Sequence, residues 1–300
     1  LSVEHTRVTT EEFIGNSYRL EYFLNVEALH PGSNFGRIIL ESPYETLTYE
    51  VVVEKDISRD EDYRANDREF AGIVKNYLKY ESGKLELNEW VEEAIRRISH
   101  LREVDDRNEF YLLAHAHICL IGKRLEEAKW LLESYNYNRF AIGKDVELSS
   151  YYLYLTTLLS NDTIGQRKVA EELSKSFMKH PDSWKILCML VEVDSEYKIY
   201  SERLRALEKQ FYDEKSHSVW FYLQAFKCYR EKSSSLKKLG MFEVRVLLFA
   251  VKHKLMTREL ALYTANLASQ MKVFDKQLYA VLVGSYKMYK ESMILTAICT

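Results

Sequence analysis

The spacing of apolar side chains changes along the chain, and the change divides it into two parts. Over residues 18–29 apolar residues recur at every second position, which is typical of a strand with one buried face. Residues 30–36 carry Pro, Gly, Ser and Asn and predict a turn, and short runs rich in β-branched residues follow at 37–42 and 46–55. We expect an antiparallel β module at residues 1–56, a partial sandwich truncated at its N-terminus, because so few strands rarely fold alone.

A helical period replaces this alternation from about residue 67. Val219, Tyr222 and Phe226 fall on one stripe of a predicted helix, and similar stripes follow to the end of the chain. Only ten glycines and three prolines occur in 300 residues, well below the ordinary shares of about 7% and 5%. The sequence therefore predicts a mainly α fold behind the β module. We take the charged stretch 57–69 as a linker, although it also fits the capped start of the first helix.

The predicted helices alternate with a regular spacing. Helices of one kind start about 34 to 39 residues apart, and each is followed by a turn and a second helix, which is the period of stacked helix-turn-helix repeats. One such pair cannot bury its apolar face alone, so neighbouring pairs stack into a solenoid with a concave surface. The first helices are predicted to start near residues 109, 148, 183 and 217, and the second helices near 124, 163, 196 and 236.

The segment "EFYLLAHAHICLIGKRLEEAKWLLESY" resembles a tetratricopeptide repeat (TPR). Leu112 stands at the bulky first-helix position, and the small residues Ala116 and Ala128 stand where two helices cross closely. The next unit keeps a small residue at Ala170, but no unit has the full Trp-Leu-Gly-Tyr signature. The resemblance implies a right-handed TPR-like α-solenoid over residues 70–300, which acts by binding proteins or peptides.

The order of the modules is also similar to the N-terminal part of a family of large, uncharacterised bacterial proteins. The resemblance rests on the β module followed by "NYLKYESGKLELNEWVEEAI", "LLAHAHICLIGKRLEEAKWLLESYN" and "KESMILTAICT". In that family a sandwich-like domain precedes a long helical-repeat region. The resemblance implies this order of domains and carries no known activity.

Charge and cysteine content restrict the kinds of binding partner and the cellular compartment that we expect. With 42 Lys and Arg against 45 Asp and Glu, and both signs interspersed, the chain lacks the basic stripe that binding to nucleic-acid phosphates requires. Its apolar runs are far shorter than the ~20 residues of a membrane span. We therefore expect no nucleic-acid partner and no membrane span. The four cysteines are expected to be reduced and buried, which favours the cytoplasm, with a secreted full-length protein as the alternative because the N-terminus reads as truncated.

The stretch "LLAHAHICL" raises the question of a metal site. In a strand, His115, His117 and Cys119 would share one face, as metal ligands must. In the predicted helix only His115 and Cys119 share a face, which leaves two ligands where a structural zinc ion needs four. We therefore predict that no metal binds here.

Motifs that carry catalytic chemistry do not occur. The sequence has no GxSxG, no phosphate-binding GxxxxGK[ST] and no GxGxxG after a strand, so we predict neither enzymatic activity nor a cofactor. We expect a non-catalytic scaffold that binds a protein or peptide of unknown identity. The alternatives are the accessory N-terminal region of a larger multidomain enzyme and a cell-surface adhesion-type protein.

Repeat position predicts which side chains form the binding groove. Tyrosines are frequent, 22 in all, and the cluster "SSYYLYL" fits the packing of a repeat core, with a binding surface as the alternative. First-helix positions that point to the concave side are the better candidates. The predicted groove residues are Leu113, His117, Lys185, Met189, Phe221 and Ala225.

Overall fold

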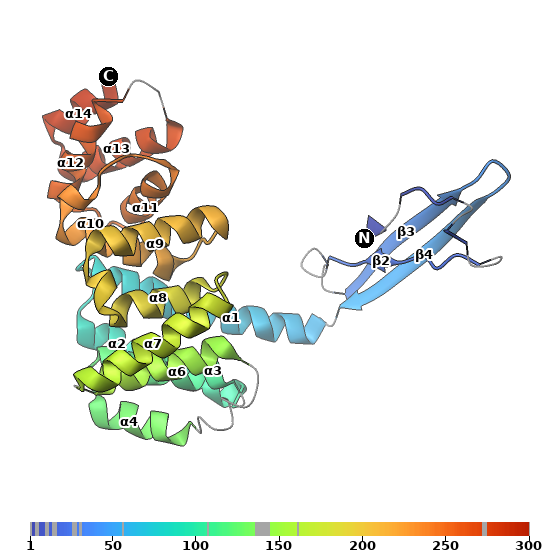
Figure 1. Ribbon diagram of the computed structural model, residues 1–300, viewed down its shortest axis with the longest axis horizontal. Coiled ribbons are helices and arrows are strands. Elements are labelled where there is room, and N and C mark those ends of the chain that lie inside the picture. Colours follow the sequence, from blue (N-terminus) through green and yellow to red (C-terminus); the bar gives the residue numbers. More distant parts are fainter. Residues whose placement is uncertain are drawn as a thin grey trace. The chain divides into compact units, whose positions relative to one another are not determined.

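The computed structural model describes residues 2–3, 6–9, 12–13, 17–25, 29, 32–55, 57–106, 108–135, 145–160, 162–271 and 275–299. The chain divides into two compact units, Leu1–Arg68 and Glu69–Thr300. The described residues form thirteen α-helices and two small antiparallel hairpins, with a helical content of 69% (Figure 1). The predicted mainly α class with an N-terminal β module is therefore confirmed.

The N-terminal unit contains two antiparallel strand pairs. The longer pair keeps an unbroken register from Gly32 opposite Lys55 to Glu41 opposite Thr46. Ser42 closes its turn, because the Ser42 hydroxyl accepts the Glu45 N–H at 2.9 Å and donates to the Glu45 carbonyl at 2.8 Å. The strands are β1 (Ser2–Val3), paired with β2 (Tyr22–Phe23), and β3 (Gly32–Glu41), paired with β4 (Thr46–Lys55).

Two details differ from the expected β module. The turn predicted at residues 30–36 is wrong from Gly32 onward, because these residues pair with the β-branched C-terminal half of β4 and are extended; the chain reverses at 42–45 instead. Of the strand predicted at 18–29, only Tyr22–Phe23 is a strand in the described part, and residues 26–28 lie outside it.

A series of helices makes up the second unit. The stretch 57–69 is helical from Ile57, so it is the start of the first helix rather than a linker. The predicted first and second helices of the four repeats are all present. The helices are α1 (Ile57–Glu81), α2 (Leu87–Val104), α3 (Glu109–Ile121), α4 (Leu125–Ser134), α6 (Val146–Leu159), α7 (Thr163–Lys179), α8 (Trp184–Val193), α9 (Tyr200–Asp213), α10 (Val219–Glu231), α11 (Met241–Lys252), α12 (Arg258–Ala268), α13 (Lys276–Tyr289) and α14 (Ser292–Cys299).

Side chains at three helix starts satisfy backbone N–H groups that have no partner inside the helix. Asp145 accepts the N–H groups of Glu147 and Leu148 at 2.9 and 3.0 Å and so caps α6. Ser183 caps α8 and Ser218 caps α10 in the same way. These caps therefore stabilise the N-terminal ends of the three helices.

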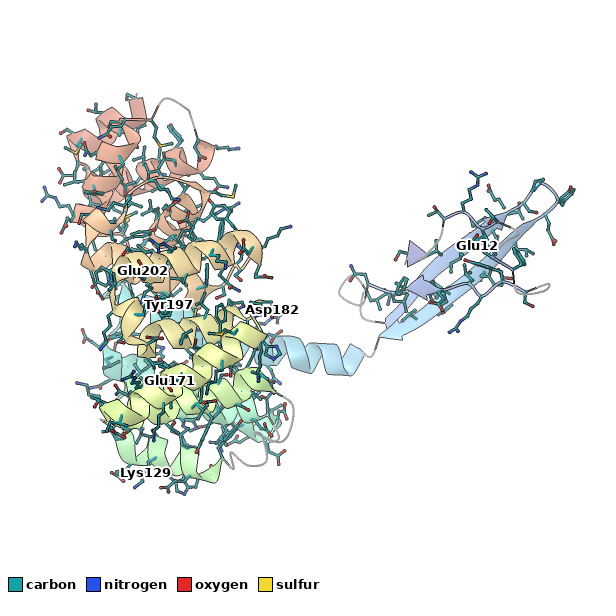
Figure 2. All side chains as sticks on the ribbon, viewed as in Figure 1. Glu12, Lys129, Glu171, Asp182, Tyr197 and Glu202 are labelled. Atoms are coloured by element: carbon teal, nitrogen blue, oxygen red, sulfur yellow. The ribbon has the colours of Figure 1, made fainter. Side chains whose placement is uncertain are left out.

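The helices pack in antiparallel pairs that are themselves stacked. Within the pairs, α3 packs on α4, α6 on α7, α8 on α9 and α10 on α11, and the first helices α3, α6, α8 and α10 also touch in sequence (Figure 1). Ala116 of α3 and Ala128 of α4 are fully buried in one core cluster, as the close approach of two helices requires. Lys129 of α4 and Glu171 of α7 lie on the outside (Figure 2).

The C-terminal half of α1 contacts two helices that are far apart in the sequence. The carbonyl of Ile73 accepts the indole N–H of Trp90 in α2 at 3.2 Å. At the end of α1, Glu81 pairs with Arg230 of α10 at 2.8 Å and with Lys227 at 3.8 Å. This segment of α1 therefore joins the first helices of the unit to α10.

Two further expectations concern the cysteines and the membrane. Cys119, Cys188 and Cys228 are buried free thiols, as predicted, whereas Cys299 is exposed at the end of α14, so the expectation of burial is wrong for this residue. In the described ranges no helix combines the length and the apolar character that crossing a bilayer requires.

Candidate functional site

The helical unit contains a cavity of about 600 Å³ that is partly open to the outside. Helices α3, α6, α8 and α10 each present one face to it, and α1 and α2 complete its walls. This volume lies within the roughly 300–1,000 Å³ that is usual for ligand pockets. The wall is mainly apolar, and its aromatic side chains include Phe70, Tyr77, Trp90, Phe110, Tyr151, Tyr154, Trp184 and Trp220.

Rings from three helices form one part of the wall. The ring centroid of Tyr77 in α1 lies 5.0 Å from that of Trp90 in α2 and 5.1 Å from that of Trp220 in α10. Aromatic pairs at such distances attract each other beyond the area they bury. Since Tyr77 is itself buried, these contacts hold the rings in place without a ligand.

A second group of rings surrounds His117. Its Nδ1 lies 2.8 Å from the Tyr151 hydroxyl, and its ring packs edge-on against Tyr151 and Tyr154, with centroid distances of 5.7 Å to each. Burial lowers the pKa of His117 to about 4, because a charged imidazole is poorly solvated there. His117 is therefore neutral at neutral pH and offers a hydrogen bond but no charge.

Glu192, in the last turn of α8, brings a carboxylate to the cavity. The Tyr154 hydroxyl and the Gln224 side-chain amide each donate a hydrogen bond to it. The pKa of Tyr154 lies well above its ordinary value, mainly because the hydroxyl is buried and also because Glu192 is negatively charged. This hydroxyl therefore remains a donor. The cavity thus combines apolar walls with one carboxylate held by two neutral donors.

An ion pair lies at the border of the cavity. Lys185 Nζ is 2.6 Å from Glu147 Oε2, and the Ser183 hydroxyl donates to Glu147 Oε1 at 2.6 Å. Burial raises the pKa of Glu147, but Lys185 and Ser183 together outweigh burial and lower it. Glu147 is therefore ionised, and the positive charge of Lys185 compensates its negative charge.

The groups in the cavity are suited to binding more than to catalysis. The thiol of Cys188 has its pKa raised by burial and by the charge of Glu192, so it stays protonated and is a poor nucleophile. His117, with its lowered pKa, is a weak base. What these residues provide is an apolar enclosure with a few fixed hydrogen-bonding groups.

Three of the six predicted groove residues line the cavity: His117, Lys185 and Met189. Lys185 is exposed, whereas Met189 is 7% exposed and closes the wall. The structure therefore brings residues of α3 and α8 together at one cavity.

The expectation that the other three, Leu113, Phe221 and Ala225, face a groove is wrong. Each has an exposed fraction of 0%, and Phe221 packs its ring on Phe242 of α11, at a centroid distance of 6.2 Å. A shift of one residue turns a helical side chain by about 100°, and on α10 the cavity face is shifted by one position from the predicted face, as it is beside Leu113 on α3. The residues found there are Ala114, Trp220 and Gln224.

Sequence reasoning missed the carboxylate and most of the rings. Glu192 is the one charged residue in the run "ILCMLVEV", and a lone acid in an apolar helix is a signal that could have identified it. Tyr151 and Tyr154 lie in the noted cluster "SSYYLYL", where three-residue spacing places both on one face. Tyr77 and Trp90 had no such signal, because their helices lie outside the repeats.

The structure brings a third polar group to His115 and Cys119. Glu127 of α4 joins them, and one potential ligand atom of each lies within 4.8 Å of the others. However, Arg102 Nη1 is 3.0 Å from His115 Nδ1, and a guanidinium group can only donate a hydrogen bond. Burial, and then Arg102, lower the pKa of His115.

The proton position at this cluster follows from these contacts. In the neutral His115 that accepts from Arg102 at Nδ1, the proton is on Nε2, which lies 3.7 Å from Glu127 Oε1. Burial also raises the pKa of Cys119 to about 12, so the thiol keeps its proton. A cation bound by these three groups would have to displace both protons, and His115 Nε2 lies beyond hydrogen-bond distance of Glu127.

Comparison with known proteins gives one match. A family model described as "Family of unknown function (DUF5717) N-terminal" matches residues 1–300. No curated protein and no solved structure matches the chain. The match includes both the β module and the helical unit, so the two occur together in one family region.

Proposed function

We propose a function for this chain, which belongs to the DUF5717 N-terminal family: it is a non-catalytic, TPR-like scaffold that binds a peptide segment of a partner protein. The observation that carries the proposal is the cavity to which the first helices α3, α6, α8 and α10 each contribute one face. A surface built by successive first helices is the one that TPR-like arrays use for binding. The small residues Ala116 and Ala128 at a helix crossing support the TPR-like assignment.

The chemistry of the wall supports a peptide as the occupant. Large rings supply apolar contact area that is already ordered, so little conformational entropy is lost on binding. The few polar groups, among them His117 and Glu192, are fixed by hydrogen bonds and are positioned to set the orientation of a ligand. Interfaces of this composition concentrate binding energy in a small central cluster.

The contacts of α1 support the same proposal. Its segment from Ile73 to Glu81 already packs beside the cavity, with its polar end held by Arg230 and Lys227. An extended or helical segment of another protein would use the same kinds of contact. The remaining space of about 600 Å³ is sufficient for a few side chains.

The proposal is tested by filling the cavity. Leu148 lines it and is half-buried, so Leu148→Trp should occupy part of the space. Leu158 lies on the same helix, is 42% exposed and does not line the cavity, so Leu158→Trp is the matched control. Random peptides displayed on phage are selected on the 300-residue chain, and the thermal midpoints of all three proteins are compared first.

The expected result is a group of peptides that bind the wild type and Leu158→Trp alike and bind Leu148→Trp at least ~10-fold more weakly. Peptides that bind all three proteins equally would place the binding surface elsewhere. Failure to select any peptide that depends on the cavity would contradict the proposed function.

A further inference from the structure

Charged groups in the cavity wall are mostly acidic. Among the residues that the structure describes, Asp145, Glu147 and Glu192 line the cavity, against one basic side chain, Lys185. Lys185 is paired with Glu147 at 2.6 Å, so these two charges neutralise each other. Asp145 accepts backbone N–H groups as the cap of α6. Glu192 is the carboxylate for which the described part of the wall supplies no opposite charge.

The described residues that hold Glu192 are neutral donors. They are the Tyr154 hydroxyl and the side-chain amide of Gln224. Within the described ranges, no Lys, Arg or His nitrogen lies at ion-pair distance from its oxygens. Lys227 and Arg230, which follow Gln224 on α10, engage Glu81 instead. Nevertheless Glu192 is accessible from the cavity, so a ligand can reach it.

Aromatic faces lie around the same space. Tyr151 and Tyr154 stack with centroids 6.4 Å apart, and Tyr77 lies 5.1 Å from Trp220. The faces of such rings attract ammonium and guanidinium groups, and the attraction grows when the site excludes water. Burial, and then the charge of Glu192, raise the pKa of Tyr151, so its hydroxyl stays neutral.

We propose that the cavity receives a lysine or arginine side chain of the bound peptide, with the cationic head at Glu192 and the alkyl stem against the rings of Tyr151, Tyr154 and Trp220. The inference rests on the proposed function and specifies its ligand. A basic side chain combines a cation with an apolar stem, and the cavity offers a carboxylate at one place and apolar rings along the rest. An acidic side chain would meet the uncompensated charge of Glu192 and be repelled.

The test uses the peptides selected on the wild-type chain and one isosteric substitution. Glu192→Gln removes the charge and keeps oxygen and nitrogen atoms that can bond to Tyr154 and Gln224, and its thermal midpoint is compared with that of the wild type first. Glu196→Gln, an exposed glutamate that does not line the cavity, is the matched control. On the peptide side, norleucine in place of lysine removes the charge and keeps the stem.

The expected result is a shared basic position in the cavity-dependent peptides. Their affinity should fall ~10-fold or more for Glu192→Gln and stay unchanged for Glu196→Gln. Replacing lysine by norleucine should weaken binding to the wild type by a similar factor and have little further effect on Glu192→Gln, because the two changes remove the same interaction.

Two other outcomes separate the inference from the function on which it rests. Cavity-dependent peptides that lack a basic residue and bind Glu192→Gln as well as the wild type would overturn the inference and leave the proposed function standing. A selection without any peptide sensitive to Leu148→Trp would overturn both. Where Glu192→Gln unfolds the protein, the norleucine substitution decides on the wild type alone: affinity unchanged by norleucine would overturn the inference.

Discussion

Glu81 in α1 accepts a hydrogen bond at 2.8 Å from Arg230 in α10, although the two residues are 149 positions apart. Lys227 adds a second cation at 3.8 Å, and the Tyr77 hydroxyl donates to the same carboxylate at 2.8 Å. The Glu81 side chain is only 10% exposed. One carboxylate therefore anchors the end of α1 to the wall that also carries Trp220.

Removal of this charge should destabilise the helical unit. Glu81→Gln leaves Arg230 and Lys227 half-buried without their partner, and we expect a loss of ~2 kcal/mol in the free energy of unfolding, below the ~3–5 kcal/mol of a fully buried pair. Urea unfolding at neutral pH measures it. The control is Glu202→Gln, which breaks an exposed pair with Arg205 and should cost less than ~0.5 kcal/mol. Equal effects of both substitutions would show that Glu81 has no special role.

The contribution of Glu81 should depend on pH. Burial raises its pKa, but Lys227 and the hydrogen bonds from Arg230 and Tyr77 outweigh burial, so the pKa is lowered from its usual value. A carboxyl group whose pKa is lower in the folded state stabilises the protein above its unfolded pKa, and this contribution is lost as the pH falls through the folded pKa. The difference in stability between wild type and Glu81→Gln should be largest at neutral pH and shrink in acid. A difference independent of pH would contradict the ion pair.

The crossing of α3 and α4 should not tolerate a large side chain. Ala128 is fully buried beside Ala116, so Ala128→Trp overpacks the crossing and should lower stability by ~1–3 kcal/mol or more. Lys129, the next residue, is exposed on the outside of α4, and Lys129→Trp is the control with nearly unchanged stability (Figure 2). Thermal midpoints of the two variants check this, and equal midpoints would refute the repeat crossing.

His117 should resist protonation. Its pKa of about 4 predicts that its ring signals in an NMR titration stay those of the neutral form until the pH falls well below the ordinary histidine range near 6.5. The same residue in urea-unfolded protein is the reference and should titrate in that ordinary range. Titration of the folded protein near pH 6.5 would show that His117 is hydrated and not enclosed by Tyr151 and Tyr154.

Periodicity made the repeat helices predictable, because their apolar stripes and small residues recur at a fixed distance. The same information does not orient each helix: at Phe221 and Ala225 an error of one position turned a predicted groove residue into a core residue. On α3 and α8 the named residues His117 and Met189 line the cavity, but Leu113, named on the same face of α3 as His117, is a core residue. The orientation of a helix is determined by its neighbours in space, which spacing along the chain does not specify.

The role of α1 was not predictable for a related reason. The ion pair of Glu81 with Arg230 and the ring contact of Tyr77 with Trp220 join parts of the chain that only tertiary packing brings together. In the β module, local composition itself was misleading. It predicted a turn at 30–36, but from Gly32 onward these residues pair with β4. Local patterns thus identified the elements but not their contacts.

The four tryptophans allow the central claim, that the cavity binds a peptide, to be tested in one measurement. Trp90, Trp184 and Trp220 line the cavity, whereas Trp130 on α4 does not and is 64% exposed. A selected peptide is titrated into the ¹⁵N-labelled chain and the indole N–H signals are followed. We predict that the signals of Trp184 and Trp220 shift with saturation while that of Trp130 stays unchanged. A shift of Trp130 alone, or of none of the four at saturating peptide, would contradict the claim.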